Sequence, residues 1–174
     1  MEPSPWVARF APMISAGGVV LDLACGGGRH SRLLATLGHQ VEAVDRDAEA
    51  LAALAGIPGI HTQCSDLEGG PWPYAGRAFA GIVVTNYLWR PLLPFLLAAL
   101  DHGGLLIYET FMSGNELFRP PSNPAFLLRP GELLDVVRGR LSVLAFEQGQ
   151  VGADQPAVVQ RLCAQRGGTL YLPD

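Results

Sequence analysis

The stretch Val-Val-Leu-Asp-Leu-Ala-Cys-Gly-Gly-Gly-Arg-His-Ser, residues 19–31, is an apolar run that ends in a glycine cluster. This pattern predicts a buried strand, a sharp turn and the start of a helix, which is how a sheet presents backbone N–H groups to a ligand. Gly26, Gly27 and Gly28 lack a Cβ atom, so a ligand can approach the turn closely. Asp22 lies near the carboxyl end of the strand, where its charge favours a cation over a pyrophosphate. The stretch therefore predicts a ligand-binding loop.

Apolar strands alternate with helical segments along the rest of the chain. This alternation predicts an α/β fold with a doubly wound, mostly parallel sheet that has helices on both faces. The expected helices are Ser31–Leu37, Ala48–Ala55 with Asp47 as its N-cap, Leu92–Leu100, and one with Pro130 in its first position. The expected strands are Val19–Leu23, Gln40–Val44, Ile60–Cys64, Phe79–Val84, Leu105–Thr110, Leu141–Glu147 and Ala157–Ala164. The last two strands follow each other directly, which predicts an antiparallel hairpin at the edge of the sheet.

Composition restricts the class of protein and of partner. The 174 residues, 49% of them hydrophobic, fit a single domain over residues 1–174 with a sizeable core. With a net charge of −4, the chain has no excess of basic residues to attract nucleic acid or an anionic membrane. We therefore expect a small or neutral partner, and neither nucleic acid nor a membrane. The sequence carries no indication of an oligomeric state.

Cysteine usage and the N-terminus indicate the compartment. Cys25, Cys64 and Cys163 are odd in number and widely spaced, so we expect reduced thiols rather than disulfides. They form no C-x-x-C pair or Cys/His cluster, so no metal site is expected. The N-terminal residues lack the pattern of a secretory signal, and no run is long enough to span a bilayer. We therefore expect a cytoplasmic location.

Three aspartates follow successive strands of the expected sheet. Asp22, Asp45 and Asp66 each lie at or just beyond a carboxyl end, the edge at which open α/β sheets bind ligands. A single aspartate in such a place is commonly a turn former or a helix cap. The joint spacing of all three with the glycine loop favours one ligand site along this edge.

The loop Asp-Leu-Ala-Cys-Gly-Gly-Gly, residues 22–28, resembles the D-x-G-C-G-x-G motif of class I S-adenosylmethionine-dependent methyltransferases, with Ala24 in place of the first glycine. The resemblance covers nearly the whole chain. It implies a Rossmann-like sheet of seven strands, the last one antiparallel, with S-adenosylmethionine as cofactor and a small molecule as methyl acceptor. Small bacterial methyltransferases of the tellurite-resistance type are similar in size and in this motif.

The resemblance also implies which residues contact the cofactor. Asp22 would face the ammonium of the methionine part, Asp45 the ribose hydroxyls, and Asp66 the adenine amino group. Arg29 or His30 would meet the carboxylate, Arg46 would stack on the adenine, and the Leu67 N–H would lie near a ring nitrogen. The further cofactor-binding candidates are Ala24, Cys25, Gly26, Gly28, Ser65, Thr85 and Asn86. Cys25 and Asp66 also have plain structural interpretations, as a packing residue and as a turn former.

The catalytic group is less well defined. A general base is needed only if the acceptor is protonated at the working pH, and the candidates are Tyr87, Glu109 and His30. A thiolate or a selenium or tellurium anion would need none. The run from Thr85 to Arg90 differs from the N/D-P-P-Y signature of enzymes that methylate nucleobase amines or glutamine amides. Tyr87 and Trp89 would line an aromatic pocket or pack in the core.

Two segments are expected to cover the site. The connection after the fifth strand is long and mixes aromatic, Asn and Arg residues, so residues 111–129 are expected to form a substrate lid, stiffened by Pro120, Pro121 and Pro124. Residues 1–18 are expected to form an N-terminal cover, in which Trp6 and Phe10 lie over the cofactor or simply pack in the core.

Two alternatives remain open. A nicotinamide-dependent oxidoreductase would also use an acid such as Asp45 for ribose, but the G-x-G-x-x-G fingerprint would place Ser31 at its third glycine. A non-catalytic S-adenosylmethionine-binding module would keep the loop and the acids and would have no acceptor pocket.

Overall fold

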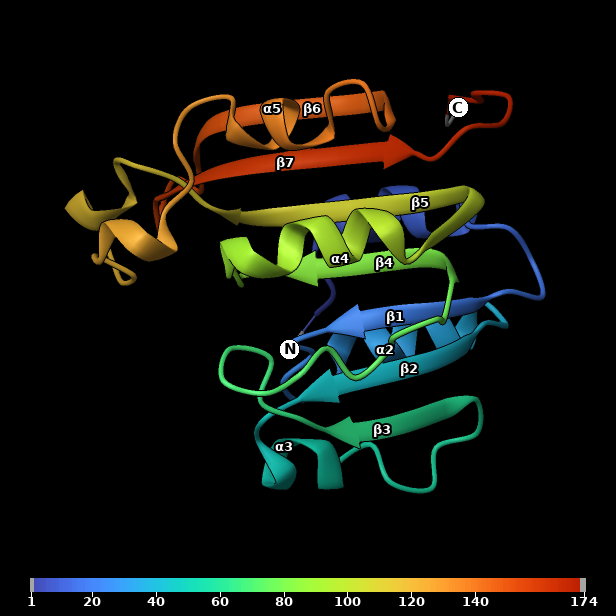
Figure 1. The fold of residues 1–174 in the computed structure, drawn as a ribbon. Coiled ribbons are helices and arrows are strands. Elements are labelled where there is room, and N and C mark those ends of the chain that lie inside the picture. The colour runs from blue at the N-terminus through green and yellow to red at the C-terminus, as the bar shows by residue number, and fades with distance from the viewer. Residues whose placement is uncertain (1, 173–174) are drawn as a thin grey trace.

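A computed structural model describes residues 2–172, so Met1 of the expected N-terminal cover and the last two residues of the expected domain, 173–174, lie outside the described residues. The chain forms a seven-stranded sheet in the order β3-β2-β1-β4-β5-β7-β6 (Figure 1). The strands are β1 Val19–Leu23, β2 Gln40–Asp45, β3 Ile60–Cys64, β4 Phe79–Thr85, β5 Leu100–Phe111, β6 Ser142–Val151 and β7 Ala157–Gln165.

Strand directions confirm the expected topology. The first five strands pair in parallel, and β7 runs antiparallel to both β5 and β6. Strand β7 lies between its two partners, so β6 is the edge strand. Because the parallel strands all point the same way, their carboxyl ends meet at one edge of the sheet, where the long connection after β5 also lies (Figure 1).

All but the first of the described helices lie close to the expected places but differ at their ends, and the first lies where no helix was expected. They are α1 Pro5–Phe10, α2 Arg29–Thr36, α3 Ala48–Ala52, α4 Leu93–Ala98 and α5 Glu132–Val137. Asp47 is the N-cap of α3, with its Oδ1 accepting the N–H groups of Glu49 and Ala50 at 3.0 Å each. The prediction that Pro130 occupies the first position of α5 is wrong, because Gly131 caps this helix in a left-handed conformation and the helix begins at Glu132.

Strand and helix boundaries also differ near β5. The expected helix to Leu100 ends at Ala98, and β5 begins at Leu100 rather than Leu105. The polar and glycine residues 101–104 hide the start of this strand in the sequence, and the pairing of β4 with β5 shifts register there. Strand β6 likewise extends beyond Glu147 to Val151, although its outer residues are polar and exposed.

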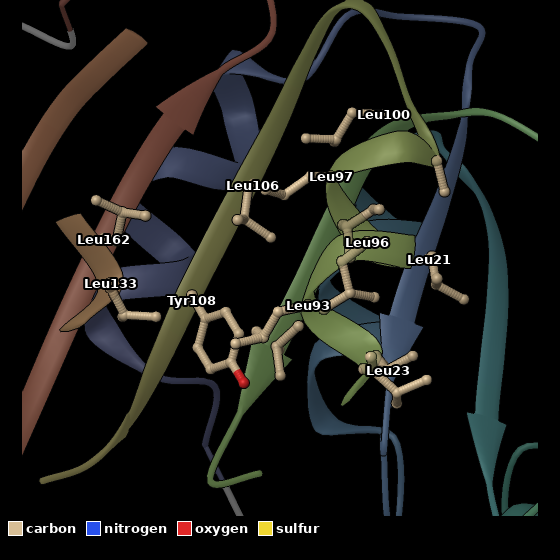
Figure 2. Close-up of a cluster of buried hydrophobic side chains, with 14 of the residues drawn as sticks. Leu21, Leu23, Leu93, Leu96, Leu97, Leu100, Leu106, Tyr108, Leu133 and Leu162 are labelled. Atoms are coloured by element: carbon tan, nitrogen blue, oxygen red, sulfur yellow. The ribbon is translucent and has the colours of Figure 1, made fainter. Parts of the chain in front are cut away.

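Helices cover both faces of the sheet. Helices α4 and α5 lie on one face, and α1 and α2 lie on the other (Figure 1). Figure 2 shows the first face, where leucines of α4 and Leu133 of α5 pack against leucines of the strands and against Tyr108. Trp6, Val7 and Phe10 of α1 belong to a second buried cluster on the opposite face, which includes Val20 and Ile107.

The connection between β3 and β4 covers the sheet without a helix. Residues 65–78 form turns and cross in front of β1 and β2, where Trp72 and Tyr74 pack on the first core cluster (Figure 1). The start of this connection, at Asp66, Leu67 and Glu68, therefore lies beside the carboxyl ends of the central strands. Within residues 2–172, none of the helices combines the length and the apolar character needed to cross a bilayer.

Candidate active site

The glycine loop joins β1 to α2 through several residues in the left-handed region. Ala24 has φ +52°, Gly26 +51° and Gly28 +72°. A Cβ atom added to Gly26 or Gly27 would meet no atom within 4 Å, so open space lies over the loop. A Cβ atom on Gly28 would lie 2.4 Å from the side chain of Leu54. The first two glycines therefore leave room for a ligand, while Gly28 allows close packing.

Replacing Ala24 with glycine is expected to raise the free energy of unfolding by about 1 kcal/mol, because a left-handed φ costs an L-residue roughly that much and costs glycine little. Urea denaturation measures the change. Ala52→Gly, in the exposed part of α3, is the matched control and is expected to lower stability by about 1 kcal/mol. Destabilisation by both substitutions would contradict the strain at Ala24.

Asp22 lies behind the loop, not in front of it. Its side chain is 1% exposed, and the Ser31 hydroxyl donates to its Oδ2 at 2.6 Å. Burial raises the pKa of this carboxyl to about 6, against the opposing effect of the hydrogen bonds from Ser31. Asp22 thus holds the first turn of α2 against β1, and it is absent from the lining of the cavities described next.

Asp45 connects the glycine loop to the end of β2. Its Oδ2 accepts the Gly26 N–H at 2.8 Å, and its Oδ1 accepts the Asp47 N–H at 3.0 Å. A carboxylate oxygen has two lone-pair sites, so each oxygen retains capacity for a ligand hydroxyl. The carboxylate therefore fixes the loop and also faces the site.

Two adjoining cavities run along the carboxyl edge of the sheet. The first, of about 260 Å³, is lined by Ala24, Asp45, Arg46, Ser65, Asp66, Leu67, Glu68, Asn86 and Tyr87. The second, of about 560 Å³, is lined by Ala24, Cys25, Gly26, Gly27, Gly28, Arg29, Arg32, Thr85 and Asn86. Both include Ala24 and Asn86, so they meet between the ends of β1 and β4. Every residue expected to contact the cofactor lines one of them, with the exceptions of Asp22 and His30.

Asp66 presents its carboxylate to the first cavity from a turn. Its Oδ1 accepts the Glu68 N–H at 3.0 Å, and the N–H groups of Glu68 and Gly69 lower the pKa of the carboxyl. The aspartate is thus both a turn former and a cavity residue. Glu68 and Arg32 line the cavities although sequence reasoning missed them, since nothing in their local pattern distinguishes them from loop or helix-surface residues.

A third cavity, of about 210 Å³, adjoins the first. It is lined by Glu68, Asn86, Tyr87, Leu88, Thr110, Phe111, Pro121 and Phe126. Asn86 lines all three cavities, and it holds a left-handed backbone with φ +55° at the end of β4. Pro121 and Phe126 belong to residues 111–129, so this segment forms one wall of the third cavity.

Residues 111–129 are held to the rest of the domain by polar contacts. The Arg90 guanidinium donates to the carbonyl oxygens of Ala125 at 2.7 Å and Leu127 at 2.8 Å, and it forms a two-pronged ion pair with Glu132. The Asn115 side chain is fully buried and accepts the Val158 N–H at 3.1 Å. These contacts hold the segment in a defined conformation beside the third cavity.

The structure separates the candidate general bases. Tyr87 lines the first and third cavities, and its buried hydroxyl lacks a hydrogen-bond partner among the described residues. Burial raises the pKa of this phenol well above its usual value, with the nearby Glu68 carboxylate adding to the effect. Tyr87 is therefore protonated and suited to donate a hydrogen bond rather than to accept a proton.

His30 and Glu109 lie outside the lining of all three cavities and hold the N-terminal segment. The Ser4 N–H donates to His30 Nε2 at 3.0 Å, and the Ser4 hydroxyl donates to Glu109 Oε1 at 2.8 Å. Burial lowers the pKa of His30 to about 4, so the ring is neutral, and its Nδ1 lies 3.4 Å from Thr85 Oγ1. Glu109 also pairs with Arg161. These contacts favour a structural role for both.

The aromatic residues of the N-terminal segment pack in the core. Trp6 and Phe10 are 3% and 0% exposed, and the Trp6 Nε1–H donates to the Leu162 carbonyl at 3.2 Å. The packing interpretation thus describes them, and neither lines a described cavity. Of the expected cover, Glu2 lies nearest the site, since its carbonyl accepts from Arg29 at 3.3 Å.

Comparison with known proteins agrees with this geometry. A family described as a methyltransferase domain matches residues 20–102, which run from β1 to the start of β5. The seven-stranded sheet accordingly has the fold of class I S-adenosylmethionine-dependent methyltransferases. No curated protein matched the chain.

Solved structures share the fold of the domain. TehB from Haemophilus influenzae superposes with a TM-score of 0.75 at 20% identity, over 91% of this chain and 61% of TehB. An S-adenosylmethionine-dependent methyltransferase from Methanosarcina mazei gives 0.72 at 16% identity, over 97% of this chain and 100% of the other. The 1,6-didemethyltoxoflavin-N1-methyltransferase of Burkholderia thailandensis, with bound S-adenosylhomocysteine, gives 0.63 at 18% identity, over 93% and 79%. The chain thus spans about three fifths of the length of TehB.

Proposed function

We propose that this domain transfers a methyl group from S-adenosylmethionine to a small-molecule acceptor in the third cavity. The observation that carries the proposal is the position of Asn86, which lines the two cofactor-sized cavities and the third cavity together. When bound, S-adenosylmethionine supplies a methyl group that its sulfonium already activates. The contribution of the protein is then to align the acceptor with the methyl carbon and to exclude water.

The residues present fit the cofactor. We assign adenosine to the first cavity, with Asp45 on the ribose hydroxyls and Asp66 and the Leu67 N–H on the adenine. We assign the methionine part to the second cavity, over the open space at Gly26 and Gly27, with Arg29 on the carboxylate. In this arrangement Asp22 supports the loop from behind.

A small acceptor is supported by the size and walls of the third cavity. Its volume of about 210 Å³ is closed on one side by Pro121 and Phe126. The similar Burkholderia thailandensis enzyme acts on 1,6-didemethyltoxoflavin, a small molecule. The cysteines Cys25, Cys64 and Cys163 are all free, which favours a reducing, cytoplasmic setting for this reaction.

The two alternatives are less well supported. A nicotinamide dinucleotide would need close approach at the third position of its fingerprint, but Ser31 there is fully buried and bonded to Asp22. A module without catalytic activity would not require a cavity that adjoins the cofactor cavities through Asn86.

Calorimetric titration tests the cofactor assignment. Micromolar binding of S-adenosylmethionine and S-adenosylhomocysteine is expected, without binding of NAD. Transfer is then tested by release of S-adenosylhomocysteine in the presence of amines, thiols and metalloid anions. Binding of NAD alone would overturn the proposal, and cofactor binding without turnover on any acceptor would favour the non-catalytic alternative.

Replacing Asp45 with alanine is expected to weaken S-adenosylhomocysteine binding by about 1.5–3 kcal/mol, because hydrogen bonds to a charged group are lost and the Gly26 N–H loses its partner. The calorimetric Kd measures this. Asp47→Ala removes a neighbouring carboxylate that caps α3 without lining a described cavity, and it is the matched control. Equal effects of the two substitutions would place the ribose elsewhere.

A further inference from the structure

We propose that the methyl acceptor is a small planar nitrogen compound, a neutral amine or N–H heterocycle, and that Glu68 selects it. This inference rests on the proposed methyl transfer and narrows its substrate class. Glu68 lines both the first and the third cavity, so it stands where cofactor and acceptor spaces meet.

The charges around the three cavities are divided. Arg29 and Arg32 line the second cavity and Arg46 lines the first. Glu68 is the charged residue in the lining of the third cavity, which includes neither an arginine nor a histidine. An anion placed there would be repelled by this carboxylate without a compensating cation, whereas an N–H group or a cation would be attracted. Thiolates and metalloid oxyanions are therefore disfavoured as acceptors.

The lining of the third cavity also includes a residue with a hydrogen-bond donor, Tyr87. The Tyr87 hydroxyl is buried and has no partner among the described residues, and buried polar groups are normally hydrogen-bonded. Because the phenol stays protonated, it needs an acceptor lone pair on the ligand. Glu68 accepts an N–H, and Tyr87 donates to a lone pair. A ring with one of each, such as an imidazole or a pyrazole, satisfies both groups.

The remaining walls suit a flat ligand. Phe111, Pro121 and Phe126 present aromatic and proline rings to a space of about 210 Å³, which is small for a ligand site. A planar ring of one or two cycles buries its faces against such walls. The size thus agrees with a heterocycle better than with a flexible chain.

The transfer step balances with these residues. The acceptor nitrogen uses its lone pair to form the new bond to the methyl carbon, and the electron pair of the S–CH₃ bond stays on the sulfur. The N–H proton then passes to the Glu68 carboxylate, from the methylated nitrogen of an amine or from the other ring nitrogen of an N–H heterocycle. Because Glu68 is exposed, this proton can pass on to water.

Three probes of similar size test the inference on protein loaded with S-adenosylhomocysteine. They are benzimidazole, which has an N–H and a lone pair, benzamidine, which is a cation, and benzoate, which is an anion. Calorimetry or saturation-transfer NMR is expected to show benzimidazole and benzamidine binding about tenfold more tightly than benzoate, given a like-charge contact with Glu68.

Two variants separate the parts of the inference. Glu68→Gln is expected to reduce the ratio of the benzamidine affinity to the benzoate affinity by about fivefold or more. Glu49→Gln, an exposed substitution in α3 with the same change of charge, should leave this ratio unchanged. Tyr87→Phe is expected to weaken the binding of benzimidazole by about fivefold and to leave the binding of benzamidine largely unchanged, because only benzimidazole has a free lone pair.

Several results would overturn the inference. These are benzoate binding as tightly as the nitrogen probes, a preference unchanged in Glu68→Gln, or no binding of either nitrogen probe to the loaded protein. The titration with S-adenosylhomocysteine is recorded first on the same sample. If S-adenosylhomocysteine does not bind, the methyl transfer proposal is overturned as well. If S-adenosylhomocysteine binds but the three probes then bind with equal affinity, the substrate class alone is overturned.

Discussion

Replacing Asp22 with asparagine is expected to raise the free energy of unfolding at pH 7.5 by up to about 3 kcal/mol. The buried carboxyl has a pKa raised to about 6, above the value of about 3.9 expected in the unfolded chain. At pH 7.5 the wild-type protein therefore contains an ionised Asp22 that burial disfavours. Asparagine is neutral and nearly isosteric, and its amide oxygen still accepts from the Ser31 hydroxyl.

The increase in the free energy of unfolding caused by Asp22→Asn should grow as the pH rises. Between about pH 4 and pH 6 the folded state binds more protons at Asp22 than the unfolded state does, so this group makes wild-type stability fall as the pH rises. The advantage of Asp22→Asn is thus largest above pH 6 and disappears below about pH 4. Denaturation in urea across this range measures it. Asp101→Asn, an exposed substitution with the same change of charge, should stay within about 0.5 kcal/mol of the wild type.

The same variant bears on the cofactor. Since Asp22 is absent from the lining of the first and second cavities, its replacement should weaken the binding of S-adenosylhomocysteine only slightly. A loss of about tenfold or more would instead indicate a direct contact with the ammonium, as the resemblance implied. A gain in stability that does not vary with pH would contradict the assigned charge state.

Local patterns predicted the parallel sheet and most of the residues that line the first two cavities. The strand at Val19–Leu23 is recognisable from its own apolar run. Asp22, Asp45 and Asp66 lie at or just beyond the ends of β1, β2 and β3, so their positions at one edge of the sheet follow from the order of the strands. The start of β5 was missed because residues 101–104 interrupt its apolar pattern. The Pro130 prediction failed because the next residue, Gly131, can take the left-handed cap that starts α5.

The contacts that organise the acceptor side were beyond sequence reasoning. Glu68 sits in a turn with no pattern that marks it, and its position depends on how residues 65–78 cross the sheet. Similarly, Ser4 reaches His30 and Glu109 only because α1 packs beside β5. Hydrogen bonds between residues this distant along the chain depend on tertiary packing, which local periodicity does not encode.

Replacing Arg90 with methionine is expected to lower the free energy of unfolding by about 3 kcal/mol, because it leaves a buried carboxylate without its main partner. Arg90 Nε lies 2.7 Å from Glu132 Oε1, and Glu132 is 5% exposed. Arg90 also lowers the pKa of Glu132. This stabilisation requires an ionised Glu132, so the difference between variant and wild type should narrow as the pH falls into the range where the carboxyl is protonated. Thermal or urea unfolding at neutral and acid pH measures both effects.

The control for this substitution is Arg138→Met. Arg138 pairs with Asp135 at 2.7 Å, but both side chains are largely exposed, so the loss should stay within about 0.5 kcal/mol. If both variants lose the same free energy of unfolding, burial of the Arg90–Glu132 ion pair adds nothing to stability.

A double variant separates stability from the shape of the lid. Replacing Glu132 with leucine in the Arg90→Met background removes the unpaired charge, so much of the lost stability should return. The carbonyl oxygens of Ala125 and Leu127 still lack the donors that Arg90 supplied. Residues 111–129 should therefore remain more susceptible to proteolysis than in the wild type, and a benzimidazole probe should bind more weakly. If proteolysis and probe binding recover together with stability, Arg90 acts through the ion pair alone and the lid does not depend on its carbonyl contacts.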